Sequence, residues 1–128
     1  MCITDSPRAT LDRLEVHRSE NRVECAVRIR TETHTTYGAS SEPDTASGRA
    51  RAAARAALQA AEALDPDFRF GLQGVRPLDL FGHEAVVVLV DASAGRGHAH
   101  LPGAALLDQS VEEAAALAAL HALRGWVG

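Results

Sequence analysis

An internal repeat constrains this chain more than any other feature of its sequence. Residues 52–60 have the sequence AAARAALQA and residues 114–122 have AAALAALHA, so that seven of nine positions agree at a separation of 62 residues. The first copy is preceded by an alternating apolar run at 23–30 and the second by an apolar run at 85–90, and in each case a hairpin that leads to a glycine follows the run. This shared context indicates duplication of a whole structural unit, which fixes much of the architecture.

The length and composition are those of a single globular domain. With 128 residues, of which 46% are hydrophobic, the chain can bury a core without support from disulfides or metals. Two cysteines make no disulfide framework, and the first residues lack the pattern of a secretion signal, so we expect a cytoplasmic protein. We expect residues 1–10 to form a flexible N-terminal arm and residues 11–128 to form the domain.

The charge balance argues against two classes of partner. The formal net charge is −4, and no segment approaches the roughly 18 consecutive apolar residues that a membrane span requires. Nucleic acids and anionic lipids attract basic surfaces, so we expect neither as a partner. All 13 basic residues are arginine, and the absence of lysine excludes P-loop, Schiff-base, kinase and Ser-Lys chemistry.

The first repeat, residues 11–66, has the pattern of three strands followed by a helix. Apolar and polar residues alternate at 13–17 and at 23–30, which is the period of a strand with one buried face. Cys25 lies on the apolar face of the second run, so we expect a small core residue there and not a reactive thiolate. The predicted elements are strands at 13–17, 23–30 and 35–40 and a helix at 45–64, which a following Asp-Pro ends.

The second repeat, residues 67–128, has the same order of elements. Gly74 indicates a bulge in the first strand of this repeat, and residues 79–82 predict a hairpin. Ser110 and Glu113 have the spacing of a capping box at the start of a helix. The predicted elements are strands near 68–72, at 85–91 and at 98–106 and a helix from Ser110 to about Trp126.

We therefore predict an α+β fold made of two tandem βββα units, with an antiparallel sheet that carries two helices on one face. Both helices have alanine-rich stripes at a spacing of 3.6 residues, which suits packing on a sheet. The small side chains indicate that helix and sheet, or helix and helix, approach each other closely.

The segment Thr36-Tyr37-Gly38-Ala39-Ser40, followed by a loop and by residues 52–58, resembles the C-terminal leucine-sensing regulatory domain of 2-isopropylmalate synthase and its citramalate synthase relatives. The resemblance covers residues 11–127 in topology. The catalytic barrel of that family is absent from this sequence, so the synthase activity does not carry over, and no residues match an effector pocket. The resemblance implies a stand-alone binding or interaction module that associates in symmetric pairs.

Asp91, His98 and His100 are the best candidates for metal ligands. On a strand, His98 and His100 point to the same face, and a tight hairpin between them and Asp91 would bring the carboxylate beside them. Two imidazoles and a carboxylate are suitable ligands for zinc or another divalent cation. The alternative is that three polar residues simply occupy a solvated sheet face, because the sequence has no CxxC or HExxH pattern.

Three arginines, Arg49, Arg51 and Arg55, gather at the start of the first helix. The dipole of a helix already favours anions at its N-terminus, so cations placed there are mildly unfavourable unless a ligand or a carboxylate compensates them. A small anionic ligand such as a phosphate or a carboxylate would explain them. The preferred interpretation is arginine-rich codon usage together with salt bridges to Glu42 and Asp44.

Comparison of the two repeats gives the strongest functional expectation. On the strand face turned away from the helix, the first repeat has Ala26, Arg28 and Arg30, whereas the second has Val87, Leu89 and Asp91. A strand that is apolar on both faces normally has a cover on both.

We expect a second copy of the chain to cover Val87 and Leu89, which would make the protein a homodimer. The expected function is non-enzymatic: a regulatory or scaffolding module that pairs with itself and binds an unidentified protein partner or a small ligand. No cofactor is expected. The alternative is a metal-dependent enzyme or metal-binding protein that uses Asp91, His98 and His100, although the sequence places no further general base beside them.

Overall fold

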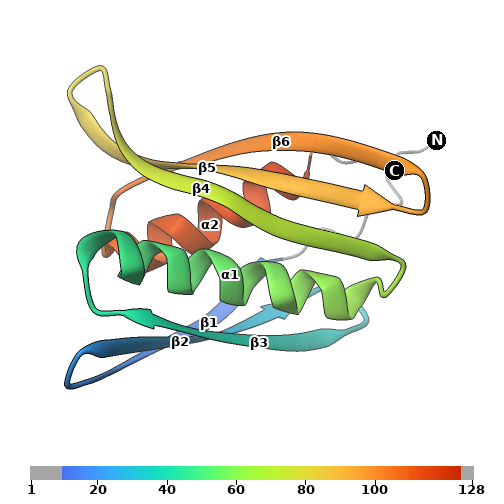
Figure 1. Ribbon diagram of the computed structural model, residues 1–128, viewed down its shortest axis with the longest axis horizontal. Coiled ribbons are helices and arrows are strands. Elements are labelled where there is room, and N and C mark those ends of the chain that lie inside the picture. Colours follow the sequence, from blue (N-terminus) through green and yellow to red (C-terminus); the bar gives the residue numbers. More distant parts are fainter. Residues whose placement is uncertain (1–9, 125–128) are drawn as a thin grey trace.

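The computed structural model describes residues 10–124, in which two βββα units follow one another along the chain (Figure 1). The fold is α+β and duplicated, as predicted. The first unit consists of β1 (Thr10–Ser19), β2 (Arg22–Arg30), β3 (Thr35–Pro43) and α1 (Ala46–Leu64). The second unit consists of β4 (Phe68–Leu80), β5 (His83–Ala94), β6 (Gly97–Leu106) and α2 (Val111–Leu123).

Each unit forms its own antiparallel sheet, with the strand order β1-β2-β3 in the first and β4-β5-β6 in the second. One sheet with both helices on one face was expected from the sequence. The structure has two sheets, one per unit, and the inner face of each lies against the helices. Alternation of apolar residues shows which side of a strand is buried, but it does not show whether β3 pairs with β4, and this is why the sequence did not separate the two arrangements.

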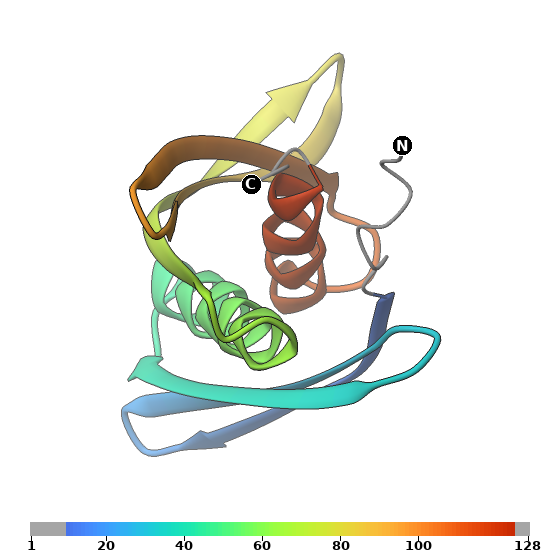
Figure 2. The same cartoon turned by 90° about the vertical axis from the view of Figure 1, so that its right-hand side faces the viewer.

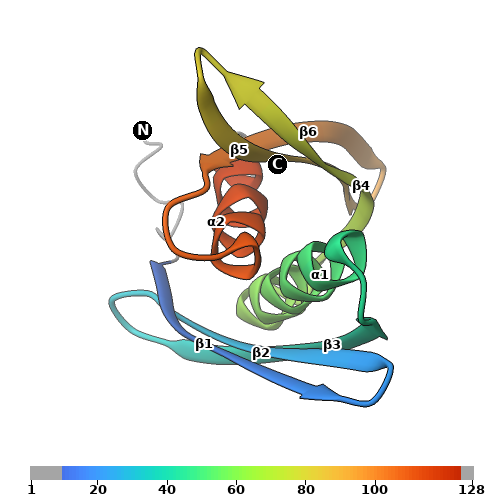
Figure 3. The ribbon, with the colours of Figure 1, turned by 90° about the vertical axis from the view of Figure 1, so that its left-hand side faces the viewer.

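The two helices form the middle layer of the molecule, with one sheet on either side (Figures 2 and 3). α1 packs on β2 and β3, α2 packs on β5 and β6, and the helices contact each other. In addition, α1 contacts β4 and α2 contacts β1, so each helix lies against both sheets. Within residues 10–124, therefore, the inner face of each sheet is covered and the outer face is not.

The inner faces of the central strands supply the larger core side chains, and the helices supply alanines. Successive side chains of a strand point to opposite faces, so one set of side chains in β2 and one in β5 lie against the helices. These sets are Val23, Cys25, Val27 and Ile29 in β2, and Val86, Val88, Val90 and Ala92 in β5. Because alanine side chains are short, the helices lie close to the sheets.

Glycines in β3 and β6 lie where helix and sheet approach most closely. A methyl group on Gly38 would stand 2.1 Å from the Ala56 carbonyl oxygen of α1, and one on Gly103 would stand 2.2 Å from the Ala118 carbonyl oxygen of α2. Both distances are too short for a non-bonded contact, so only glycine fits. The same contact in both units confirms the repeat that the alanine-rich helices predicted.

The strand pairings extend this equivalence to neighbouring positions. Gly38 pairs with Val27 and Gly103 pairs with Val88, so these two valines correspond to each other. Their neighbours along β2 and β5 correspond in the same way, from the turns that precede these strands as far as Arg30 and Asp91.

The first strand of each unit carries a β-bulge at the equivalent place. The register of β1 on β2 shifts between Leu11 and Arg13, and that of β4 on β5 shifts between Leu72 and Gly74. The bulge predicted at Gly74 is confirmed, whereas the one in β1 has no glycine to mark it and was not predicted. A bulge strengthens the local twist, so both sheets curve around the helices in the same way.

Both helices begin at side chains that cap them. The Thr45 hydroxyl accepts a hydrogen bond from the Gly48 backbone N–H, and the Ser110 hydroxyl accepts one from the Glu113 N–H. These bonds satisfy backbone donors that a helix start leaves without an intrahelical partner. The predicted starts of both helices are thereby confirmed.

The ends of the chain are described only in part. α1 ends at Leu64 as predicted, and α2 ends at Leu123, while the predicted end near Trp126 lies outside the described residues. Thr10, the last residue of the predicted arm, is the first residue of β1, and residues 1–9 also lie outside the described part. Neither α1 nor α2 is long and apolar enough to cross a lipid bilayer.

Candidate functional site

The outer face of the second sheet is apolar at its centre. Val87 and Leu89 of β5 lie on this face and are half-buried by their neighbours. Ala104 and Pro102 of β6 lie beside them in register. None of these four side chains belongs to the core that the helices cover. The structure therefore places the two residues predicted for an interface on a sheet face that nothing in residues 10–124 covers.

This apolar surface continues along the strands toward the β4–β5 hairpin. Leu78 of β4 and Leu106 of β6 flank Ala85 in register. Ala85 is only 2% exposed although it lies outside the core cluster, whereas Leu78 and Leu106 are 43% and 55% exposed. The two leucines shield the alanine and present their own side chains to solvent. We name the β-face patch for Leu78, Ala85, Val87, Leu89, Pro102, Ala104 and Leu106.

The β4–β5 hairpin extends beyond the helical layer and has a phenylalanine at its tip (Figure 1). The Phe81 side chain is 100% exposed, and its backbone has a φ of 52°. In this left-handed region a bulky residue is strained by roughly 1–2 kcal/mol, and glycine or asparagine is the usual occupant. The hairpin was predicted from the sequence, whereas Phe81 was missed. An aromatic residue directly before Gly82 in a two-residue turn is the signal that identifies it.

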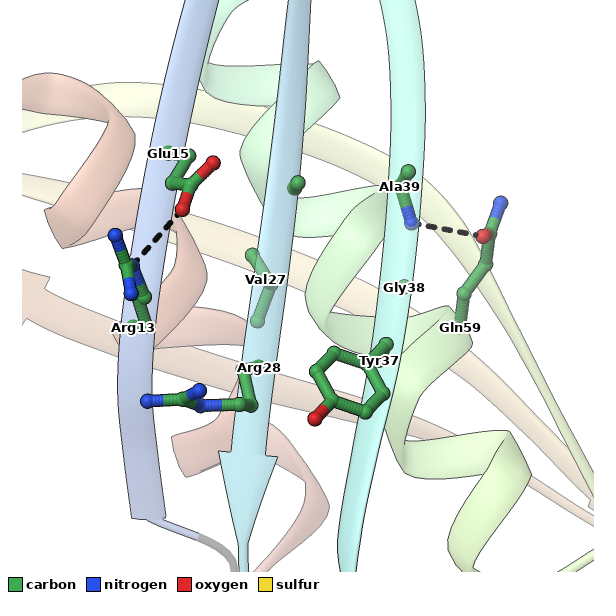
Figure 4. Close-up of a pocket in the computed structure, with 9 residues that line it drawn as sticks. Arg13, Glu15, Val27, Arg28, Tyr37, Gly38, Ala39 and Gln59 are labelled. Carbon is green, nitrogen blue, oxygen red and sulfur yellow. Dashed lines mark hydrogen bonds and ion pairs between the residues drawn. The ribbon is translucent and has the colours of Figure 1, made fainter.

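The outer face of the first sheet is charged at the equivalent positions. Arg28 corresponds to Leu89, because each follows the central-strand valine that pairs with the contact glycine. Arg28 Nε donates a hydrogen bond to Asp12 Oδ2 at 2.5 Å. Arg13 Nε lies 2.9 Å from Glu15 Oε2, a pair visible in Figure 4. At these central-strand positions the first sheet thus presents paired charges and the second presents apolar side chains, with one exposed charge, Arg76 of β4, beside Val87.

A shallow hollow of about 450 Å³ lies among these charges, lined in part by Arg13, Glu15, Arg28, Tyr37 and Gln59 (Figure 4). The hydrogen bond and negative charge of Asp12 raise the pKa of Arg28 further above its ordinary value, so this guanidinium is always charged. Because both arginines already have carboxylate partners, the hollow offers an anion little uncompensated positive charge.

Side chains of both helices hydrogen-bond to the edge strands beside them. Gln59 Oε1 accepts a hydrogen bond from the Ala39 N–H of β3, and His121 Nδ1 accepts one from the Ala104 N–H of β6. The two bonds are 3.1 Å and 3.2 Å long and occupy equivalent places in the two units. They occupy backbone donors that an edge strand would otherwise offer to another strand.

Asp91, His98 and His100 come together on the outer face of the second sheet, beyond the β-face patch. Asp91 pairs in register with His100, and His100 Nδ1 lies 2.5 Å from Asp91 Oδ1. The rings of His98 and His100 meet edge to face with their centroids 5.2 Å apart. In the described part of the chain, no group of three His, Cys, Asp or Glu side chains has an arrangement that could hold a metal ion. The three residues form a carboxylate–imidazole pair with a second imidazole beside it, and a metal there remains a prediction.

The arginines at the start of α1 lie beside carboxylates. Arg55 Nη1 is 2.9 Å from Glu42 Oε2, and Arg49 Nε is 3.9 Å from Asp44 Oδ1. Salt bridges to these two carboxylates were the alternative to an anionic ligand in the sequence analysis. Arg51 makes no ion pair with any residue of 10–124, so it is the one member of the trio whose charge is left for a ligand.

Cys25 is a core residue, as predicted. Its side chain has no solvent exposure, and burial, followed by the nearby charges of Glu112 and Glu24, raises the pKa of its thiol to about 11. Because the thiolate is the nucleophilic form of cysteine, this thiol is unreactive near neutral pH.

The comparison with known proteins adds no further constraint. No protein-family model matches the sequence, and no curated protein matches it significantly. Function is therefore inferred from the two outer sheet faces and from the residues that differ between them.

Proposed function

We propose that this chain is a non-enzymatic interaction module, regulatory or scaffolding in role, that pairs with a second copy of itself through the β-face patch. The observation that carries the proposal is the contrast between two equivalent surfaces. The first unit places charged side chains on its outer face, and the second places Val87 and Leu89 there, flanked by Leu78 and Leu106.

The physical argument is one of hydration. Both sheets have the same backbone frame, so the first sheet shows that this frame folds with a charged outer face. Folding of the second sheet therefore does not require an apolar outer face. Removing such a face from water is favourable by about 25 cal/mol of free energy per Å² of apolar area. Large contiguous apolar patches on soluble domains mark interaction sites.

A second copy is the simplest cover for this surface. In a twofold pair both partners use the same patch, so each copy covers the apolar surface of the other. Two sheets pack face to face at a separation of about 10 Å with their side chains interleaved. The resemblance to a leucine-sensing regulatory domain supports the same proposal, since such a module acts in symmetric pairs, and it extends the proposal to an unidentified partner or small effector.

The competing proposal is a metal-binding protein or metal-dependent enzyme. The adjacency of Asp91, His98 and His100 on one sheet face favours it, and the absence, within residues 10–124, of three such side chains arranged to hold a metal ion weighs against it. Metal analysis of the purified protein separates the two proposals. A stoichiometric metal that is lost from a His98→Ala, His100→Ala variant would support the competing one.

Substitution of Leu89 by arginine tests the leading proposal. Leu89→Arg gives β5 the residue that β2 has at the equivalent position, Arg28, so the sheet should tolerate it. We expect light scattering at micromolar concentration to give twice the chain mass of 13.5 kDa for the unsubstituted protein and the single chain mass for Leu89→Arg.

Ala26→Arg is the matched control. Ala26 lies on the outer face of the first sheet at the position equivalent to Val87, so the same charge is added to the same strand of the other unit. This variant should keep the mass of the unsubstituted protein. A monomeric unsubstituted protein, or a Leu89→Arg variant of unchanged mass, would contradict the proposal.

A further inference from the structure

The β4–β5 hairpin has features that do not stabilise the chain to which it belongs. The extra length of β4 and β5 relative to β1 and β2 lies at the end away from the turn, so both hairpins have the same length between the bulge and the turn. Phe81 at its tip is fully exposed and has a left-handed backbone. An exposed aromatic ring gains no burial, and a bulky residue in this conformation is strained. Both features are unfavourable in the isolated chain.

The equivalent turn of the first unit shows that the backbone shape does not require an aromatic residue. Glu20 occupies the corresponding position of the β1–β2 turn, with a φ of 48°, and its side chain is exposed. The two turns therefore share a conformation and differ in chemistry, with a charged side chain in one and an apolar ring in the other. The difference concerns what the turn presents to its surroundings.

We infer that Phe81 packs against a second copy of this chain and that the β4–β5 hairpin is an arm of the dimer interface. This inference rests on the proposed function. Leu78 and Leu106 connect the tip of the hairpin to Val87 and Leu89 through one continuous apolar surface, because they flank Ala85 in register. A copy that covers the centre of the patch lies next to the hairpin as well.

The size of the sheet face supports an extended interface. A three-stranded face about ten residues long projects roughly 500 Å², from a strand spacing of about 4.8 Å and a rise of about 3.4 Å per residue. Stable interfaces of standard size bury about 800 Å² on each partner. The sheet face alone gives a small interface, and a hairpin that reaches onto the partner enlarges it.

Other occupants fit the hairpin less well. Strand addition along β4 is hindered by the bulge at Gly74 and by Pro77, which lacks a backbone donor. Asp79 and Glu84 beside the tip give the hairpin acidic character, which disfavours an anionic membrane or a nucleic acid. The exposed ring itself fits an apolar protein surface.

Replacement of Phe81 by asparagine tests the inference. Asparagine tolerates the left-handed conformation, so Phe81→Asn removes the ring and relieves the strain without disturbing the turn. We expect sedimentation velocity over a series of concentrations to show a dissociation constant raised at least tenfold, with dimer still formed at high concentration. Glu20→Asn makes the same change at the equivalent turn and should leave the dissociation constant unchanged. Circular dichroism verifies that both variants are folded.

The outcomes separate this inference from the proposed function. A dimer whose dissociation constant is unchanged in Phe81→Asn would overturn the role of the hairpin and leave the β-face patch as the interface. A protein that is monomeric at every concentration would overturn both. Equal weakening by Phe81→Asn and Glu20→Asn would show that the turns act on folding and not on the contact, and would also overturn the inference.

Discussion

Arg28 in the first unit and Leu89 in the second occupy the same position on equivalent strands, yet one forms an ion pair with Asp12 in contact with water and the other lies in an apolar patch. The same contrast extends to the hairpin tips, where Glu20 corresponds to Phe81. On their inner faces the units agree closely, down to the glycine that touches a helix backbone in each.

This pattern shows which contacts the fold requires. Features needed to pack a sheet on a helix occur in both units: the contact glycine, the bulge in the first strand and the hydroxyl cap of the helix. Features of the outer faces occur in one unit only. The outer face of the second sheet is therefore the place where this chain has specialised. Substitutions at equivalent positions of the two units can test both the shared inner contacts and the differing outer faces.

The largest effect should come from the shared inner contacts. We expect Gly38→Ala and Gly103→Ala each to lower the free energy of unfolding by about 2–3 kcal/mol, because the added methyl group would overlap the helix backbone and force helix and sheet apart. Urea denaturation at one fixed protein concentration measures both values.

Gly71→Ala is the control for these two variants. A methyl group on Gly71 would have no atom within 4 Å, and the backbone there is not left-handed, so we expect a change within about 0.5 kcal/mol. If only one of the two contact glycines proved sensitive, the equivalence of the units would be wrong.

Much of the fold was predictable because both units have strong local patterns. Alternation in β2 predicted its buried face, Ser110 with Glu113 predicted the start of α2, and Gly74 predicted a bulge. The division into two sheets was not predictable, since it depends on which strands become neighbours in space. Local residue patterns contain no information about that choice.

The candidate site was predictable only at its centre. Val87 and Leu89 were identified because a central strand with two apolar faces is visible in the sequence. Leu78 and Leu106 were missed because their membership of the patch depends on strand register, which places both beside Ala85. Phe81 was missed because a turn residue is identified by its backbone geometry and not by hydrophobic periodicity.

A moderate effect on stability is expected at a core position of the central strands, where β2 has Cys25 and β5 has Val86. Because the folded-state pKa of the thiol is raised to about 11 from a value of 9.0, the unfolded chain loses this proton first as the pH rises. The contribution of Cys25 to stability is therefore complete below pH 9.0 and is lost between pH 9.0 and about 11.

Cys25→Val should make the first unit resemble the second. We expect stability within about 1 kcal/mol of the unsubstituted protein at pH 7, because the two side chains are similar in volume. Denaturation curves recorded from pH 7 to pH 11 should then show a smaller loss for the variant. Parallel losses in the two proteins would contradict this prediction, because they would show that the thiol has the same pKa in the folded and unfolded states.

The smallest effect concerns the edge strands. Gln59→Ala and His121→Ala each remove one hydrogen bond to an edge-strand N–H, and we expect each to cost about 0.5–1 kcal/mol. His121→Gln copies the first unit and should restore most of the loss. A His121→Gln variant as unstable as His121→Ala would show that the second unit needs the imidazole for another reason.

The most direct test of the central claim measures the solvent accessibility of both outer sheet faces, in the unsubstituted protein and in Leu89→Arg. Hydroxyl-radical footprinting with mass spectrometry measures how accessible each side chain is to solvent. In the single chain, Tyr37 on the first sheet is 67% exposed, and Leu78 and Leu106 on the second are 43% and 55% exposed. In the unsubstituted protein at micromolar concentration, we predict that Tyr37 is oxidised at the same rate as in Leu89→Arg and that Leu78 and Leu106 are oxidised several-fold more slowly. Equal oxidation of the two leucines in both proteins would contradict the account, because it would show that the outer face of the second sheet has no cover in solution.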